Sequence, residues 1–551
     1  MEKKWWQDEI VYQIYPKSFY DTNGDGIGDL KGITAKLDYL KRLGVTMIWI
    51  CPIFKSPMID NGYDIADYEE INPEFGTMAD FDELLKEANK RGMKLILDLV
   101  INHTSDEHPW FKEALNNPHS KYRNYYIFKP GKDGNPPNNW RSVFGGSVWE
   151  QVPGEEMYYL HVFDKKQPDL NWENKEMRRE LYAMINRWLE KGVAGFRIDS
   201  ITFIKKDSDY ASLPADGVDG LVSCKFKTRN RPGIEVFLKE LKENTFAKFD
   251  AVTIGEAPGV DYNDYNNFIG EDGYFSMIFD FHYADIDVES GSDWFKRTNW
   301  TVKEFKELLF RSQHAIQVSG WGANFIENHD QPRALSKMIK EEKWQTAETA
   351  KTLGMMYFFL RGTPFIYQGQ ELGMKNFTRT SITSFNDISS VDNYHRSIQE
   401  GFTEAEALHF VNLRSRDNTR TPFPWNNEQY GGFTSRTPWL AMTEEYPEIN
   451  AENNSVFGFY QQMIQLRQAG ELSEALRLGT IQQIEDVPDE VIAYTRESKD
   501  KKIFILTNLS DKKVTVKLDH FIQNVHLCSY NKPFISGNEV VLEPYQGILF
   551  E

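Results

Sequence analysis

The amino-acid sequence predicts an α/β protein built on a (β/α)8 barrel, with a loop-rich domain inserted after the third strand and an antiparallel β-domain at the carboxyl terminus. Up to about residue 370, short apolar runs alternate with amphipathic helical stretches, which is the pattern of a parallel sheet covered by helices on both faces. There are eight such runs, the number that closes a barrel. An open doubly wound sheet is the alternative, but no glycine-rich phosphate loop follows the first run.

Each expected strand is a short apolar run bounded by polar or turn-forming residues. The fourth strand closes with the charged pair Arg197 and Asp199 and follows a helix that ends at Gly192. Because strand side chains alternate between two faces, Arg197 and Asp199 should project to the same side. In chain order, the expected strands are residues 9–15, 47–50, 95–100, 195–199, 251–256, 275–281, 322–326 and 363–368.

The helices between these strands are expected from apolar residues spaced three and four apart and from signals at the helix ends. Thr77 and Asp80 match a capping box, and Asn174 is the expected N-cap of the helix before the fourth strand. The expected apolar stripes cover residues 30–43, 81–88, 177–188 and 236–241.

Two long segments interrupt this alternation, and a different pattern follows it. Residues 103–172 are rich in Asn, Pro, Gly and aromatic residues, with an expected hairpin at 155–163, and residues 372–446 are expected to be irregular. Beyond about residue 482, short strands are expected at 491–494, 502–506, 514–518, 540–542 and 547–550. The expected domains are a barrel (1–102 and 173–481), an inserted substrate-pocket domain (103–172) and a C-terminal β-sandwich (482–551).

Composition narrows the classes of function. With 551 residues, 40% of them apolar, the chain has the composition of a globular protein of two to four domains. A net charge of −19 argues against nucleic acid and anionic membrane surfaces as partners. The three cysteines show no metal-ligand spacing and no disulfide framework. Residues 1–15 lack the apolar core of a signal peptide and no segment reads as a membrane span, so we expect a cytoplasmic protein.

The loop at residues 21–29 carries oxygen donors at its first, third, fifth and ninth positions and a glycine at the sixth. This order matches the first part of an EF-hand calcium loop, although Gly32 stands where the glutamate of position twelve is expected. We expect one structural Ca²⁺ or Mg²⁺ ion here, with a metal-free Asx turn as the alternative. The side-chain donors are Asp21, Asn23, Asp25 and Asp29.

Acidic residues stand at the carboxyl ends of several expected strands, where a barrel brings side chains together. They include Asp98, Asp199, Glu256 and residues of the run 327–330. One ionised carboxylate and one carboxylic acid with a raised pKa are what glycoside hydrolysis requires. We expect Arg197 to keep Asp199 ionised as a nucleophile, and burial at the end of an apolar strand to raise the pKa of Glu256.

Taken together, these motifs resemble the α-amylase family of retaining glycoside hydrolases over nearly the whole chain. The four family motifs correspond to residues 98–103 (DLVINH), 195–199 (GFRID), 254–256 (IGE) and 327–330 (ENHD). Residues 167–171 (QPDLN), 362–369 (GTPFIYQG) and 420–422 (RTP) resemble markers of its oligo-1,6-glucosidase subgroup.

The resemblance implies a role for each residue of the site. Asp199 would be the nucleophile, Glu256 the acid/base and Asp330 the residue that holds sugar hydroxyls and stabilises the charged transition state. The residues implied to contact the sugar are Asp60, Tyr63, His103, Arg197, His329 and Arg416. Asp60 and Arg416 would close the pocket around the terminal glucose, which implies exo action.

The same resemblance implies a structural calcium ion and no organic cofactor. Its ligands would be Asp21, Asn23, Asp25, the carbonyl of Ile27 and Asp29. Small oligosaccharides are the expected partners, and we expect a monomer.

Ser200 departs from the subgroup pattern, in which valine after the nucleophile accompanies α-1,6 specificity and threonine or alanine accompanies α-1,4 specificity. A small polar residue at this position leaves more room and offers a hydroxyl. We therefore expect an exo-acting retaining α-glucosidase that releases α-glucose from isomaltose and isomaltooligosaccharides and also cleaves α-1,4 bonds or sucrose.

Other functions within the resemblance stay open. A trehalose-6-phosphate hydrolase needs a basic pocket, for which residues 205–206 and 225–231 are candidates, although solvated surface also explains them. A sucrose isomerase is expected to carry an Arg-Leu-Asp-Arg run where residues 296–300 read KRTNW. A non-enzymatic accessory subunit of a transporter is opposed by the retained acids and by the lack of an expected membrane helix.

Overall fold

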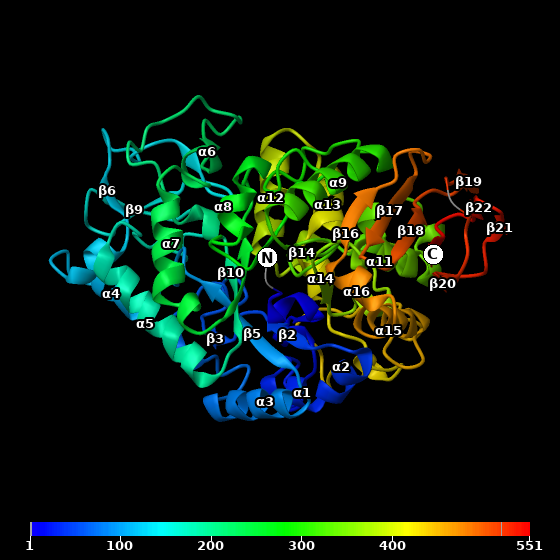
Figure 1. The fold of residues 1–551 in the computed structure, drawn as a ribbon. Helices are drawn as coiled ribbons and strands as arrows, with labels where there is room; N and C mark the ends of the chain where they lie inside the picture. Colours follow the sequence, from blue (N-terminus) through cyan, green and yellow to red (C-terminus); the bar gives the residue numbers. More distant parts are fainter. Residues whose placement is uncertain (1–2, 520) are drawn as a thin grey trace.

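The computed structural model describes residues 3–519 and 521–551, and in it eight parallel strands close into a barrel in the order β1-β15-β14-β13-β12-β10-β5-β2 (Figure 1). The predicted (β/α)8 class is confirmed. Residues 1 and 2, in the stretch that shows no signal peptide, and residue 520, in the predicted β-domain, lie outside the described residues. The barrel strands are β1 (Val11–Ile14), β2 (Met47–Ile50), β5 (Lys94–Val100), β10 (Gly195–Asp199), β12 (Val252–Glu256), β13 (Met277–Phe279), β14 (Gly322–Asn324) and β15 (Thr363–Tyr367).

The helices around the barrel begin and end largely where the sequence signals place them. Thr77 and Asp80 form the reciprocal capping box of α3, and Asn174 accepts the first backbone amides of α5. The predicted stripe at 30–43 is two helices, because the backbone leaves helical geometry at Lys36 while the apolar spacing continues across the bend. These helices are α1 (Leu30–Ala35), α2 (Leu37–Leu43), α3 (Met78–Lys90), α5 (Lys175–Lys191), α7 (Ile234–Asn244), α8 (Tyr265–Ile269), α9 (Val302–Ser319), α10 (Ala334–Met338), α11 (Ala347–Phe358), α15 (Ser455–Gln468) and α16 (Ser473–Leu478).

The inserted segment contains α4 (Pro109–Asn116) and a small antiparallel sheet of β6 (Phe128–Pro130), β9 (Met157–Leu160) and β8 (Trp149–Gln151). A hairpin is present, formed by β8 and β9, but it spans residues 149–160 and so begins six residues before the predicted range 155–163. A further strand, β7 (Trp140–Arg141), pairs with β11 (Val222–Ser223), which comes after the fourth barrel strand, and Trp140 packs with Phe203 and Val222. A short hairpin of β3 (Phe54–Lys55) and β4 (Asp67–Ile71) follows β2. We propose that residues 103–172 form the inserted domain and that β11 is part of the same unit.

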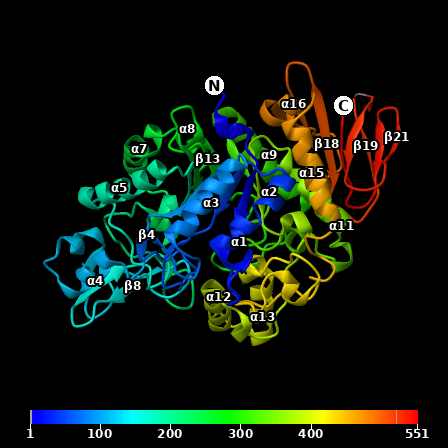
Figure 2. The ribbon, with the colours of Figure 1, turned by 90° about the horizontal axis from the view of Figure 1, so that it is seen from below.

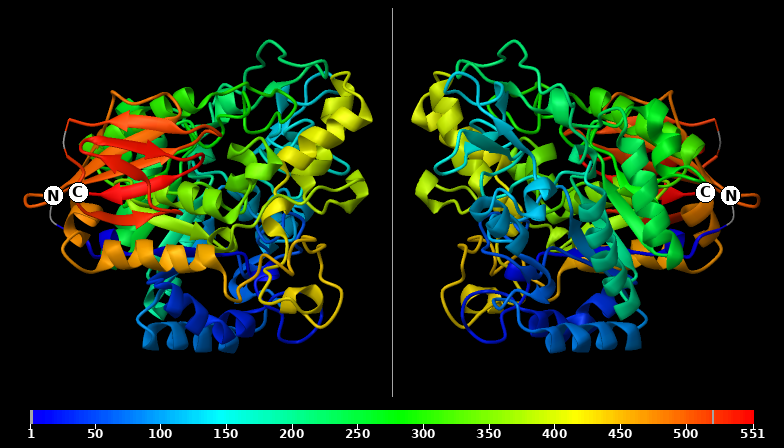
Figure 3. Two further views of the ribbon diagram at one scale, coloured as in Figure 1. Left: turned by 90° about the vertical axis from the view of Figure 1, so that its right-hand side faces the viewer. Right: turned by 90° about the vertical axis from the view of Figure 1, so that its left-hand side faces the viewer.

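The segment after β15 is more regular than predicted. It contains α12 (Ile388–Gln399), α13 (Glu404–Arg414) and α14 (Asp417–Arg420), so the prediction of an irregular segment is wrong for these residues. Asp387 caps α12, and Thr403 with Glu406 forms a capping box on α13, but aromatic and polar residues interrupt the apolar stripes. Figure 3 shows these helices beside the inserted segment, and Gly145 faces the Arg396 and Asp392 side chains of α12.

The C-terminal region is two antiparallel sheets with apolar residues between them, and Figure 2 shows it on the far side of the barrel from β8 and α4. Three of its strands, β16, β20 and β21, were not predicted, because each is short and mostly polar or exposed. The strands are β16 (Thr480–Gln483), β17 (Val491–Glu497), β18 (Lys502–Asn508), β19 (Val514–Lys517), β20 (Val525–Cys528), β21 (Phe534–Ser536), β22 (Glu539–Leu542) and β23 (Gly547–Phe550). In the described part of the chain, no helix combines the length and apolar character needed to cross a bilayer.

Candidate active site

Arg197, on β10, contacts three carboxylates at the carboxyl ends of three adjacent barrel strands. Its Nη1 lies 2.8 Å from Asp98 Oδ1 and 2.7 Å from Asp199 Oδ1, and its Nη2 lies 2.9 Å from Glu256 Oε2. In the parallel register Arg197 stands opposite Asp98 on β5 and Ile254 on β12, so these ends are level. The guanidinium is 1% exposed, and a buried cation of this kind requires the anionic partners that it has.

Burial gives the two facing acids different pKa values. Burial raises the pKa of Glu256 to about 8, although Arg197 opposes the shift. Burial also raises the pKa of Asp199, to about 6, again against Arg197. At neutral pH the site therefore favours an ionised Asp199 and a protonated Glu256, which is the division of roles that acid–base chemistry at a glycosidic bond requires.

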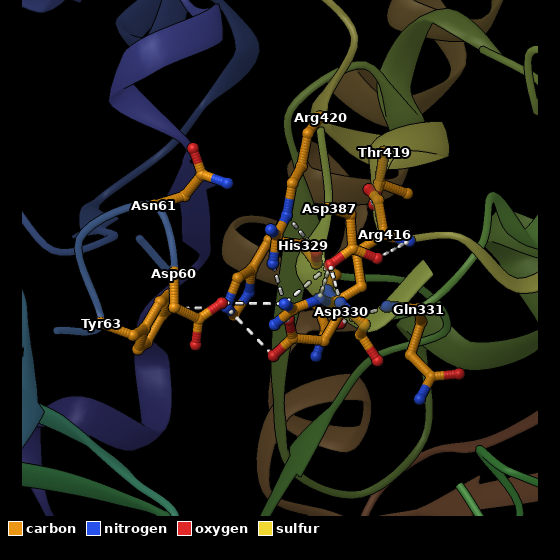
Figure 4. Close-up of polar contacts among 12 residues, drawn as sticks. Asp60, Asn61, Tyr63, His329, Asp330, Gln331, Asp387, Arg416, Thr419 and Arg420 are labelled. Atoms are coloured by element: carbon orange, nitrogen blue, oxygen red, sulfur yellow. Dashed lines mark hydrogen bonds and ion pairs between the residues drawn. The ribbon is translucent and has the colours of Figure 1, made fainter. Parts of the chain in front are cut away.

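Asp330 lies among positively charged and hydrogen-bonding partners (Figure 4). His329 Nε2 is 3.1 Å from Asp330 Oδ2, and Arg420 Nη2 is 3.0 Å from Asp330 Oδ1. Burial opposes ionisation, but His329, Arg416 and Arg420 hold the pKa of Asp330 below its usual value. Asp330 is therefore a permanent negative charge in the site.

Arg416 joins two loops that are far apart in the sequence (Figure 4). Its Nη2 lies 2.8 Å from Asp60 Oδ1 and 2.7 Å from Asp387 Oδ1. Asp60 belongs to the loop after β2, whereas Asp387 caps α12 in the segment after β15. A third loop joins here, because Gln167 Nε2 donates to Asp60 Oδ2 at 3.1 Å. This cluster forms one wall of the site.

Tyr63, on the same loop as Asp60, connects this loop to His103 and to the Arg197 cluster. His103 Nε2 is 3.0 Å from the Tyr63 carbonyl oxygen, and Tyr63 Oη donates to Asp98 Oδ2 at 2.9 Å. The Tyr63 ring stacks on His329, with centroids 5.3 Å apart, so only its other face is available to a sugar.

Ser200 connects the end of β10 to the acid on β12. Its backbone N–H donates to Glu256 Oε2 at 2.7 Å. The residue is in the left-handed region, with φ 43° and ψ 34°, which is uncommon for serine and costs backbone strain. Ser200 therefore orients the carboxyl group of Glu256 through its backbone.

Three further residues bind the site directly. Asp98 was expected among the acids at the strand ends, and Arg420 lies inside the motif at 420–422 without an expected role. Asp387 was not expected, because its only sequence signal is that of a helix cap. Glu327, one of the acids considered at strand ends, does not join the site. Its Oε1 lies 2.9 Å from Arg333 Nη1, and its Oε2 accepts a backbone amide of α10.

The loop at residues 21–29 is wound around its own polar side chains. Asp21 accepts the backbone amides of Asn23, Gly24 and Gly26 and the hydroxyl of Thr434. Among the described residues, no group of three His, Cys, Asp or Glu side chains is arranged to hold a metal, so any site here needs amide or carbonyl oxygens as well. The loop offers both from Asn23 and Ile27, and this oxygen-only set fits a hard cation such as Ca²⁺.

Two family models match the chain, one over the barrel region and one over the C-terminal β-domain. Residues 13–475 match "Alpha amylase, catalytic domain", and residues 491–549 match "Alpha-amylase SusG C-terminal domain". The chain belongs to the α-amylase family. It is therefore a glycoside hydrolase.

Relatives within the α-amylase family cover nearly the whole chain. "Probable oligo-1,6-glucosidase 3" of Bacillus subtilis (strain 168) is 45% identical over 93% of this chain and 92% of that protein. "Oligo-1,6-glucosidase" of Parageobacillus thermoglucosidasius is 43% identical over 95% of this chain and 93% of that protein. Among solved structures, Bacillus licheniformis trehalose-6-phosphate hydrolase superposes with a TM-score of 0.91 at 39% identity, covering 100% of this chain and 99% of that one.

Proposed function

We propose that this protein is an exo-acting, retaining α-glucosidase that releases α-glucose from the non-reducing end of short oligosaccharides. The observation that carries the proposal is the contact of Asp199 and Glu256 with neighbouring nitrogens of one guanidinium, that of Arg197. Sharing one guanidinium keeps the two carboxyl groups near each other. Retaining enzymes hold them about 5 Å apart, whereas inverting enzymes leave room between them for a water molecule.

The reaction proceeds in two displacements. In the first, a carboxylate oxygen of Asp199 bonds to the anomeric carbon while Glu256 gives its proton to the departing glycosidic oxygen, so the glycosidic bond breaks and a β-linked glucosyl-enzyme forms. In the second, Glu256 takes a proton from water as the water oxygen displaces Asp199. The sugar leaves as α-glucose and both acids regain their starting protonation.

Asp330 supplies the charge that the transition state needs. Positive charge develops on the sugar ring between the two steps, and a carboxylate that stays ionised stabilises it. The contacts of Asp330 with His329 and Arg420 fix the position of its carboxylate before the substrate arrives.

The cluster of Asp60, Arg416 and Asp387 supports exo action. These residues join the loops after β2 and β15 across one side of the site, so a sugar chain extending past them would meet buried charged groups. The cluster offers paired donors and acceptors to the hydroxyls of a terminal glucose.

Substrate preference rests on Ser200 and on the relatives. Relatives that bear the name oligo-1,6-glucosidase support α-1,6 bonds as the main target. The small Ser200 side chain supports additional cleavage of α-1,4 bonds or sucrose, and sugars that replace water as the acceptor would give transglycosylation.

The test is hydrolysis of isomaltose, maltose and sucrose with the anomer of the first product followed by NMR. Release of α-glucose one unit at a time is expected. β-Glucose as the first product, or internal cleavage of longer chains, would overturn the proposal.

The proposal includes two further features, a metal site and a cellular location. We propose that Asp21, Asn23, Asp25, the Ile27 carbonyl and Asp29 hold a structural Ca²⁺, or Mg²⁺ in its place, which would stiffen the loop between β1 and α1. We also propose a cytoplasmic location, which the three unpaired cysteines support.

A further inference from the structure

Lys206 is a buried lysine in the segment that runs from β10 to the helix α6 (Lys225–Thr228), which is labelled in Figure 1. Its Nζ lies 2.7 Å from Asp169 Oδ2 and donates to Asn102 Oδ1 at 3.0 Å. Asn102 directly precedes the inserted segment and Asp169 lies near its end, where the Leu170 N–H donates to the Asn102 carbonyl oxygen at 2.9 Å. One ammonium group therefore joins the ends of β5 and β10 to the inserted segment.

The charge of Lys206 lies in the interior rather than on the surface. Only 6% of the residue is exposed, and Asp169 and Asn102 are fully buried. A buried lysine needs partners of this kind, since an unpaired charge in the interior is costly. Lys205, the next residue, instead pairs with the exposed side chain of Glu173. The two lysines considered for a phosphate pocket are therefore each paired with an acid of the chain.

The ammonium group decides how the Asn102 side chain is oriented. A half-turn exchanges the oxygen and nitrogen of an amide, and the hydrogen-bond network decides between the two orientations. An ammonium group can only donate, so the Asn102 oxygen must face Lys206. The amide nitrogen then faces His103, and Asn102 Nδ2 lies 3.2 Å from His103 Nδ1. This nitrogen of the ring is therefore an acceptor.

The His103 ring consequently carries its proton on Nε2. A neutral imidazole has a single proton, and Nδ1 has to accept from Asn102. On the other side of the ring, His103 Nε2 lies 3.0 Å from the Tyr63 carbonyl oxygen, which can only accept. Gln167 Nε2 lies 3.3 Å from the same ring atom, but it donates to Asp60 Oδ2 at 3.1 Å. Both neighbours of the ring thus require the same tautomer.

The Nε2–H group of His103 is a donor at the sugar side of the site. Gln167 Nε2 lies within 3.3 Å of both His103 Nε2 and the Asp60 carboxylate, so the donor is close to the residues proposed to close the pocket around the terminal glucose. Burial lowers the pKa of His103, and the charge of Lys206 adds to this shift, whereas Asp169 and Asp60 oppose it.

We propose that Lys206 and Asn102 are positioning residues of the glycosidase site: the ammonium group fixes the Asn102 amide, and the amide fixes the Nε2–H tautomer of His103, which donates to a hydroxyl of the bound glucose. Asp169 supplies the counter-charge that keeps Lys206 in the interior. The inference rests on the proposed function for the presence of glucose beside His103, but the tautomer itself does not depend on that function.

The first experiment measures the nitrogen chemical shifts of the His103 ring, which report the protonated atom, and the His103→Gln variant assigns the signals by their loss. In the wild type the proton should be on Nε2. Asn102→Asp, which presents a carboxylate oxygen to the ring, should put a proton on Nδ1. The double variant Lys206→Met, Asp169→Asn leaves neither charge unpaired and allows the amide to turn, so it should give a mixture of both tautomers.

Steady-state kinetics on an aryl α-glucoside tests the consequence for catalysis. Asn102→Asp and the double variant should each lower kcat/KM about tenfold, the effect of one hydrogen bond. In a His103→Gln background the same changes should have no further effect, because they act through the ring. Lys205→Met is the matched control, and it should keep both the wild-type chemical shifts and the wild-type kcat/KM.

A proton on Nδ1 in the wild type would overturn the inference, as would unchanged ring shifts in Asn102→Asp. Losses in kcat/KM that add to the loss in His103→Gln would overturn it too, since they would show that the residues act independently of the ring. Thermal melting shows whether each variant is folded, and if the double variant is not, Asn102→Asp alone decides. A wild-type protein without hydrolysis removes the proposed function, whereas the chemical shifts decide the tautomer in either case.

Discussion

The side-chain nitrogen Nε2 of Gln13 lies 2.8 Å from Nδ1 of His329, which is fully buried. An amide nitrogen can only donate, so Nδ1 accepts and the single proton of the neutral imidazole sits on Nε2. Burial keeps the ring neutral by lowering its pKa well below the usual value. Nε2–H then faces Asp330 and Tyr63. A residue on β1 thus sets the tautomer of a histidine beside Asp330.

Gln13→Glu tests this relationship. A carboxylate would accept from Nδ1–H and shift the ring toward the other tautomer or toward imidazolium. We expect kcat to fall by roughly a hundredfold, as for loss of an oriented donor in an active site. Nitrogen chemical shifts of His329 report the protonated atom, and Gln13→Met, which removes the bond without adding an acceptor, is the control. Unchanged ring shifts in Gln13→Glu would contradict the assignment.

Removal of each catalytic carboxyl group should have a different signature. Asp199→Asn should lower kcat by roughly 10³-fold or more on every substrate, because no nucleophile remains. Glu256→Gln should do so on disaccharides but much less on glucosyl fluoride, whose leaving group needs no proton. Steady-state kinetics on both substrate types distinguish the two, and near wild-type turnover by Asp199→Asn would refute its role.

The pH dependence of kcat/KM should be bell-shaped. Asp199 must be ionised, so activity is lost as the pH falls through its pKa of about 6. Glu256 must be protonated, so activity is lost as the pH rises through its pKa of about 8. Initial rates on an aryl α-glucoside measure both limbs. The alkaline limb should disappear in Glu256→Gln, and its persistence there would assign that limb to another group.

Ser200→Val should raise the ratio of isomaltose to maltose hydrolysis, because the larger side chain leaves less space for the leaving sugar. The left-handed backbone at this position is unfavourable for a β-branched residue, so stability should fall by about 1–3 kcal/mol. Ser200→Ala, which keeps the small volume, is the control. Relative rates on isomaltose, maltose and sucrose are the measurement, and a strict isomaltose preference already present in the wild type and unmoved by Ser200→Val would contradict the role of Ser200.

Ca²⁺ should raise the melting temperature, and chelation should lower it. Saturation at a hundred times Kd would add about 2.7 kcal/mol to the free energy of unfolding. Asp25→Ala should remove the effect, since Asp25 is an exposed donor with few structural contacts, while Asp250→Ala, elsewhere on the surface, should keep it. Identical melting curves with Ca²⁺ and with chelator would show that the loop is a metal-free turn.

The sequence predicts those parts of the fold that depend on local pattern. Buried runs such as residues 95–100 must lie in strands, and capping pairs such as Thr77 and Asp80 fix helix starts. α12 and α13 were not predicted, because polar contacts with distant parts of the chain, rather than an apolar stripe, stabilise them. For example, Arg396 on α12 binds Asp293.

For the site, the strand register alone explains why Arg197 meets Asp98. The register does not predict which acid of the run 327–330 lies in the site. Glu327 binds Arg333, whereas Asp330, three residues later, binds Arg420 in the site. The contact of Asp60 with Arg416 joins residues 356 positions apart, and only tertiary structure or a family resemblance reveals it.

One guanidinium shared by three acids means that the protons of Asp98, Asp199 and Glu256 are not independent. The pKa of each depends on whether the other two are charged, so the site titrates as a unit with macroscopic constants. Neutralising any one of the three by mutation should therefore move the pH profile of the remaining pair, and the effects of double variants should not add. In the resting enzyme these three acids share their bound protons. In each catalytic cycle the group transfers one proton to the leaving sugar and takes one back from water.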